Sequence, residues 1–172
     1  MSNFPPYPKL ELSKRCFVFK IILGIILFGL CSFVGIKIRQ QFSKREKFYH
    51  DLSSFCLFLR EQINFSKAPL PQIAEKFQLN CSKDFAQVLD GLKGGINGEY
   101  PKYLKEKGKV EIKSFFDRLG KSDLDSQLRL IDEHKRKIDF VYETAKNDKK
   151  KKGELGYKLS LMAGIALLII LA

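Results

Sequence analysis

The sequence predicts an all-α protein, an antiparallel helical bundle held between an N-terminal and a C-terminal transmembrane helix. Three observations support this prediction. Helix-forming residues such as Leu, Lys, Glu and Gln dominate the 172-residue chain, and no stretch shows the sustained alternation of a strand. Apolar residues recur at spacings of three and four, which places them on one face of a helix. Each end of the chain carries an apolar segment beside a cluster of basic residues.

Residues 16–36 form the first predicted transmembrane helix. The segment is apolar except for Lys20, and about 21 residues at ~1.5 Å each span a hydrocarbon core of ~30 Å. A cleaved signal peptide has a similar charged head and apolar core, but no small-x-small cleavage site follows here. We therefore expect a retained anchor, preceded by a proline-rich mobile tail over residues 1–15.

Residues 37–154 are predicted to form a cytoplasmic helical bundle. The helix of the first span continues to about residue 66 and carries an apolar stripe, made by Phe48, Leu52, Phe55, Leu59 and Ile63. A second helix opens at Ala68-Pro69-Leu70-Pro71, because proline is tolerated in a first turn. Its apolar side is Ile73, Phe77 and Leu79. A third helix over residues 82–92 buries Phe85, Val88, Leu89 and Leu92, and a fourth over residues 109–119 presents Ile112, Phe115, Phe116 and Leu119.

A long amphipathic helix is predicted to follow the fourth. Gly120 provides the left-handed residue past a helix end, and Ser122 is expected to cap the next helix by accepting the free amide of Asp125. Asp123 and Asp125 then stabilise the first turn through the helix dipole. No glycine or proline interrupts residues 121–152. The expected packing seam is Leu124, Leu128, Ile131, Ile138, Tyr142 and Ala145, with Lys135 in one of its positions.

Residues 155–172 form the second predicted transmembrane helix. From Leu159 onward the apolar tail reaches only about 21 Å at ~1.5 Å per residue, so the span has to begin near Leu155. A short span of this kind gains from packing on the first one. Glycines allow close backbone approach, and the chain offers them at Gly24, Gly29, Gly35 and Gly164. We expect the two spans to pair as a hairpin.

Basic residues give the chain a formal charge of +12 and are densest beside the apolar segments. Such an excess suits an anionic membrane surface or a nucleic acid. The membrane-flanking group is Lys37, Arg39, Lys44, Arg45, Lys47, Lys149, Lys150, Lys151 and Lys152. By the positive-inside rule this group makes the middle domain cytoplasmic and places both termini across the membrane.

Catalytic and ligand-binding patterns are not found in the sequence. His50 and His134 lack metal-ligand spacing to each other or to a cysteine, and we interpret them as exposed or core histidines. The glycine-rich stretch at residues 94–98 lacks the Gly-Lys-Ser/Thr of a phosphate loop. Four cysteines without Cys-x-x-Cys spacing do not predict a disulfide framework. We expect no catalytic residues, no cofactor, no metal and no enzymatic activity.

The order of three short motifs resembles the stage III sporulation protein AB family of endospore-forming bacteria. The matching residues are Pro69, Leu70 and Pro71 after the first helix, Leu119, Gly120, Ser122, Asp123 and Gln127 around the start of the long helix, and Leu155 and Gly156 before the apolar tail. The resemblance covers about residues 20–172. It departs from the family at Ala68, where threonine is usual, at the added tail 1–15, and in the basic run His134–Lys137, where the family is often more acidic.

This resemblance implies a fold like the cytoplasmic helical domain of the type II secretion inner-membrane platform protein. It also implies a non-enzymatic platform subunit of the mother-cell-to-forespore channel, in the outer forespore membrane of the mother cell. Its expected partners are the AA-type ATPase of the same locus, other membrane subunits, lipid and a second copy of the chain. Two alternatives remain, a membrane-tethered basic nucleic-acid-binding protein and a generic membrane adaptor. Basic residues beside the spans favour lipid and platform roles over nucleic acid.

Overall fold

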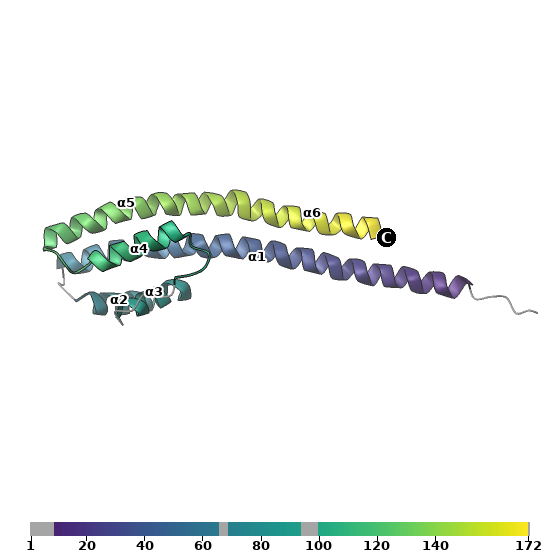
Figure 1. The fold of residues 1–172 in the computed structure, drawn as a ribbon, viewed down its shortest axis with the longest axis horizontal. Coiled ribbons are helices and arrows are strands. Elements are labelled where there is room, and N and C mark those ends of the chain that lie inside the picture. Colours follow the sequence, from purple (N-terminus) through teal and green to yellow (C-terminus); the bar gives the residue numbers. More distant parts are fainter. Residues whose placement is uncertain (1–8, 66–68, 94–99, 172) are drawn as a thin grey trace, which may run out of the picture. The chain divides into compact units, whose positions relative to one another are not determined.

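The computed structural model describes residues 9–65, 69–93 and 100–171, and the side chains of residues 19–65, 69–91 and 100–170. Figure 1 shows the helices along the chain. They are α1 (Lys9–Phe65), α2 (Leu70–Gln78), α3 (Lys83–Lys93), α4 (Glu106–Arg118), α5 (Leu124–Asp148), the π-helical turn η1 (Lys149–Gly153) and α6 (Glu154–Leu171). The described residues contain no strand, and the all-α prediction is confirmed.

The chain divides into two compact units. Unit 1 joins the residues up to Gln40 with those from Lys151 onward, and unit 2 is Gln41–Lys150. One correction concerns the tail. The structure places residues 9–15, which we assigned to a mobile tail, inside α1, and residues 1–8 lie outside the described part of the chain.

In unit 1 the first part of α1 runs antiparallel to α6, and small residues lie where the helices meet. A Cβ atom built at Gly24 would lie 3.1 Å from Leu168. Further along α1, Phe28 packs against Gly164 of α6. A Cβ at Gly164 would lie only 2.8 Å from the Phe28 ring. Later positions of α1 therefore meet earlier positions of α6, as in a hairpin. The predicted pairing of the two apolar segments is confirmed within unit 1.

A third glycine of α1 continues the same contact. A Cβ at Gly35 would lie 3.0 Å from the Cβ of Ser160. The Ser160 hydroxyl donates a hydrogen bond to the backbone carbonyl of Cys31, which uses a polar group of α6 inside the apolar pair. Gly29, which we expected to share this role, has no atom within 4 Å of its built Cβ and is exposed. The close approach thus uses Gly24, Gly35 and Gly164 but not Gly29.

Large apolar side chains cover the outer faces of this helix pair. Ile25, Phe33, Met162 and Ile169 each expose more than half of their surface. Both helices are long and apolar enough to cross a membrane, by length and composition. Apolar surface that faces outward from a helix pair is the arrangement that a bilayer favours, because lipid chains cover it without a hydration cost.

An aromatic cluster on α1 forms the centre of unit 2. The ring of Phe55 lies 5.2 Å from Phe77 of α2, 5.8 Å from Phe85 of α3 and 6.1 Å from Phe116 of α4. Phe48, two turns earlier on α1, meets Phe85 edge to face at 5.5 Å. Phe48, Phe55 and Phe85 are fully buried. The stripe predicted on this helix therefore holds α2, α3 and α4 around α1.

Predicted core positions of the three short helices are mostly confirmed. The buried ones are Ile73, Phe85, Val88, Leu89, Ile112, Phe115, Phe116 and Leu119, and Phe77 packs on them while half-buried. The predicted core position at Leu79 was wrong. α2 ends at Gln78, and Leu79, one residue past that end, is 85% exposed. The side chain of Leu92 lies outside the described residues.

The long helix α5 packs against both α1 and α4, so its buried face differs from the predicted seam. Ile131, Ile138 and Ala145 are buried as expected. Leu124 is 44% exposed and Leu128 is half-buried, which corrects the seam at its start. The buried face instead includes three residues that were not in the predicted seam: Gln127, Leu130 and His134. A helix between two neighbours needs a wide buried face, and polar side chains enter it when their polar atoms find partners.

Polar contacts join α5 to α1 in antiparallel register. Asp139 accepts a hydrogen bond from the hydroxyl of Ser53 at 2.5 Å, and Asp132 pairs with Arg60 at 3.3 Å. Lys135 occupies its predicted seam position with its ammonium group 2.5 Å from Asp139. Beyond Asp148 the backbone stays helical, but the five residues of η1 form a π-helical turn before α6 begins.

Candidate functional site

Two of the three motif segments meet at one end of unit 2. A cavity of about 410 Å³, here called the notch, lies where α1 ends and α5 begins. Its lining includes Pro69 and Leu70 from the start of α2 and Leu119, Gly120, Ser122 and Gln127 from the connection between α4 and α5. These segments are far apart in the sequence. Packing of α2 and α4 on α1 brings them together.

The side chain of Gln127 holds the wall of the notch. Its Oε1 accepts the backbone N–H of Gly120 at 3.2 Å, and its Nε2 donates to the hydroxyl of Ser122 at 2.8 Å and toward the carbonyl of Arg118 at 3.5 Å. Gly120 has φ of 78°, the left-handed conformation predicted for it, which most other residues adopt only with strain. Gln127 is 5% exposed, so a single buried amide fixes this turn.

The N-cap of α5 is Asp123 and not Ser122, which corrects the prediction. The Asp123 carboxylate accepts the backbone N–H of Ser126 at 3.1 Å. Hydrogen bonding to the side chain of Ser126, and then to its backbone, lowers the pKa of Asp123. The hydroxyl of Ser122 serves Gln127 instead. Aspartate is as good an N-cap as serine, so local preference alone does not distinguish the two positions.

The remaining motif residues do not line the notch. Pro71 is exposed in the first turn of α2. Leu155 is 57% exposed on α6, and a Cβ at Gly156 would lie 3.1 Å from Ile38 of α1, so this third motif belongs to the helix pair of unit 1.

The ten residues that line the notch include no charged side chain. Apolar groups such as Leu70 and Leu119 form most of the lining, and the Gln127 amide is already used by the turn. An opening of this kind suits an apolar side chain from another protein, because such a side chain leaves water without requiring a new polar partner.

Predicted membrane-flanking basic residues are divided among several contacts. In unit 2, Arg45 pairs with Asp148 at 3.3 Å and Lys149 pairs with Glu46 at 2.9 Å, so two of them join α1 to the end of α5 and the start of η1. In unit 1, two cations of α1 lie over aromatic rings. Lys37 is 5.2 Å from the ring centre of Phe33, and Arg39 is 5.9 Å from that of Tyr157. The others are exposed: Lys44, Lys47, Lys150, Lys151 and Lys152.

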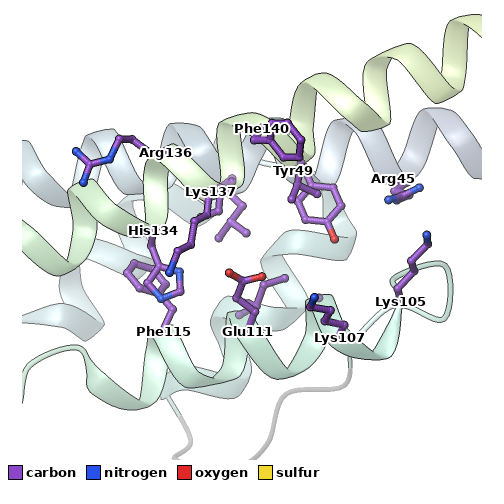
Figure 2. Close-up of a pocket in the computed structure, with 15 residues that line it drawn as sticks. Arg45, Tyr49, Lys105, Lys107, Glu111, Phe115, His134, Arg136, Lys137 and Phe140 are labelled. Carbon is purple, nitrogen blue, oxygen red and sulfur yellow. The ribbon is translucent and has the colours of Figure 1, made fainter.

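A second cavity, which sequence reasoning missed, lies in unit 2 between α1, α4 and α5. We call it the basic groove; its volume is about 610 Å³. Figure 2 shows basic side chains along it, from Arg136 near one end to Arg45 and Lys105 near the other. Of these, only Arg45 is among the site residues that the sequence predicts. The basic run at residues 134–137 was a signal, but only the packing of α4 beside α5 turns it into one side of a groove.

Close contacts shape the groove at Tyr49. A Cβ at Gly108 would lie 2.8 Å from the Tyr49 hydroxyl, so a glycine is what lets the ring approach α4. The Arg45 guanidinium lies 5.9 Å from the same ring. Burial raises the pKa of Tyr49, and the nearby charge of Arg45 opposes this. The phenol therefore stays protonated at neutral pH.

His134 lies in the wall of the groove, with its ring 4.5 Å from that of Phe115. Burial, followed by the charge of Lys137, lowers the pKa of His134, so the imidazole is neutral at pH 7. His50 has its side chain 57% exposed beside Asp51. Among the described residues, no three His, Cys, Asp or Glu side chains are grouped so as to hold a metal ion.

A family model described as stage III sporulation protein AB matches residues 20–172. The matched range includes α2 to α6, both cavities and the part of α1 that contributes to them. No curated protein and no solved structure matches the chain at a significant level.

Proposed function

The chain belongs to the stage III sporulation protein AB family, and we propose that it is a non-enzymatic membrane platform subunit of a secretion-like channel between mother cell and forespore. Family membership gives it a role in stage III of sporulation. The match over residues 20–172 is the observation that carries the proposal, because it spans both membrane-length helices and the bundle between them.

Two structural features support a platform role. The apolar outer faces of unit 1 suit an anchor in the bilayer, and the basic residues at both ends of unit 2 suit a cytoplasmic bundle beside anionic lipid. Unit 2 has a packed core, and two of its surface cavities, the notch and the basic groove, suit binding of other chains. In this proposal the protein lies in the outer forespore membrane, with the bundle in the mother-cell cytoplasm.

Gene deletion in the spore-forming host tests the sporulation role. We expect the deletion strain to complete engulfment and then arrest, with loss of heat-resistant spores, and the full chain to restore them. A chain truncated before Leu155 is the informative variant, since it keeps the bundle but loses α6. Normal spore counts in the deletion strain would contradict the proposal.

Partners are tested separately by crosslinking in sporulating cells. We propose the AA-type ATPase and the other membrane subunits of the same locus as partners, together with a second copy of this chain, and no nucleic acid. A photoreactive residue at Leu70 in the notch should capture one of these proteins, whereas one at exposed Lys76 on α2 serves as the matched control. Capture of nucleic acid in place of protein would favour the nucleic-acid alternative.

A further inference from the structure

The basic groove carries an excess of positive charge that the fold itself does not use up. Five of its lining side chains are basic and one is acidic; the basic ones are Arg45, Lys105, Lys107, Arg136 and Lys137, and the acidic one is Glu111. Arg45 pairs with Asp148, and Lys137 pairs with Glu133 at 2.7 Å. Both side chains of the second pair are more than half exposed, so this pair is weak and can be exchanged for another carboxylate.

Between the basic side chains the groove is apolar. Leu52, Ile112, Phe115 and Ile138 form its floor from three helices. Phe140 of α5 also lines it and is 76% exposed, an unusually high exposure for a phenylalanine. A partner that covers Phe140 would remove a large apolar surface from water, which is a typical contribution of aromatic side chains to protein interfaces.

The start of α4 adds to the positive field at one end of the groove. Its N-cap is Lys105, whose side chain has no acceptor atom and cannot satisfy the free N–H groups of the first turn. Lys107 and Gly108 in this first turn line the groove. Together with the helix dipole, these groups favour a carboxylate at this end.

The basic side chains are spread along the groove and do not converge on one point. Arg136 lies near one end in Figure 2, and Lys105 lies near the other, with Glu111 between them. Along α4, Lys107 and Phe115 are roughly 12 Å apart at ~1.5 Å per residue. A single phosphate group needs cations gathered around it. An elongated ligand with acids at both ends matches this spacing better.

We propose that the basic groove binds an amphipathic helix of a partner protein, with carboxylates at both ends and apolar side chains spaced three and four residues apart between them. The apolar side chains lie on the floor beside Phe140, and the carboxylates pair with Arg136 at one end and with Lys105 and Lys107 at the other. This inference goes beyond the channel role and rests on the groove alone.

A labelled synthetic peptide tests the proposal with the full chain in detergent micelles. The probe is a helical peptide of about three turns with leucines on one face and glutamates at both ends. We expect fluorescence anisotropy to show saturable binding that weakens as salt is raised. A scrambled peptide of the same composition keeps the charge but loses the apolar face, and it should bind at least about tenfold more weakly.

Charge reversal in the groove supplies the first variant. Lys107→Glu combined with Arg136→Glu should weaken peptide binding about tenfold or more, because two cross-interface attractions become repulsions. The matched control is Lys76→Glu combined with Lys113→Glu, which changes the net charge by the same amount at exposed lysines outside the groove. The control should stay within about twofold of the unchanged protein.

Phe140→Ala supplies the second variant and removes apolar contact without changing charge. It should weaken binding several-fold, whereas Leu79→Ala, at another highly exposed apolar position just past the end of α2, should not. Equal binding of the scrambled peptide would overturn the proposal. It would also be overturned by equal losses in the two charge variants, or by a short single-stranded DNA that competes as well as the peptide, because either result shows a general polyanion surface.

Discussion

The side-chain oxygen of Gln127 accepts the backbone N–H of Gly120 at 3.2 Å, and this bond joins the first turn of α5 to the turn that ends α4. The same amide donates to the hydroxyl of Ser122. Because Gly120, Ser122 and Gln127 all line the notch, its shape depends on this one side chain.

Replacement of Gln127 by alanine should destabilise the protein by about 1–3 kcal/mol, since it removes the hydrogen bonds that the buried Gln127 amide makes with Gly120 and Ser122. Thermal unfolding of the full chain in detergent, followed by circular dichroism, measures the loss. Gln72→Ala on the exposed side of α2 is the control and should change stability little. An unchanged melting temperature for Gln127→Ala would mean that the turn between α4 and α5 is stable without this side chain.

The two seam residues Ile131 and Leu128 should differ in their contribution to stability. Ile131 is fully buried, so Ile131→Ala should cost roughly 2–5 kcal/mol, as for other buried aliphatic side chains. Leu128 is half-buried, and Leu128→Ala should cost clearly less. Chemical denaturation of both variants gives the comparison. A larger loss for Leu128 would favour the seam predicted from the apolar pattern.

Stability should fall as the pH is lowered below about 6.5, in part through His134. Its pKa is lowered in the folded state, so the unfolded chain binds the proton more readily. The contribution of neutral His134 is therefore complete above the unfolded pKa and is lost as the pH falls through the folded one. Melting curves at pH 7.5 and 5.5 should show this loss, and His134→Gln should reduce it. If the unchanged protein and His134→Gln lose the same stability between these pH values, the loss comes from titratable groups other than His134.

Crosslinks between Cys31 and single cysteines along residues 159–170 should follow the helix pairing of unit 1. Positions 160 and 164 should react, because Ser160 bonds to the carbonyl of Cys31 and a Cβ at Gly164 would lie 3.4 Å from its Cβ. Positions 162 and 169 are exposed and should not react. The other native cysteines are first replaced. A uniform pattern would show that the helices do not pair in this way.

A test of membrane topology needs a new reporter cysteine, because the two native cysteines of the bundle, Cys56 and Cys81, react slowly. Burial raises the pKa of Cys56 to about 12 and that of Cys81 to about 11. Ser114→Cys in a cysteine-free chain is exposed on α4 and suits the purpose. In non-sporulating cells it should resist an impermeant thiol reagent until the membrane is opened, whereas Ser2→Cys should react at once. Immediate labelling at position 114 would place the bundle outside the cytoplasm.

The amino-acid pattern alone determined the helices, most of the core and the left-handed turn at Gly120. These follow from local chemistry: the apolar stripe from Phe48 to Leu59 repeats with the helical period, proline opens α2, and glycine ends α4. The family was also recognisable from the order of its motifs, and the match over residues 20–172 confirms it.

Tertiary structure decided which polar residues are buried and which distant segments meet. Gln127 and His134 entered the core because Gly120 and Phe115 supply their partners, and no pattern of apolar residues contains that information. The notch needs Pro69 beside Gly120, and the basic groove needs α4, which carries Lys107, beside α5, which carries Arg136. Both arise only when helices pack, since side-chain periodicity fixes the face of one helix but not its neighbour.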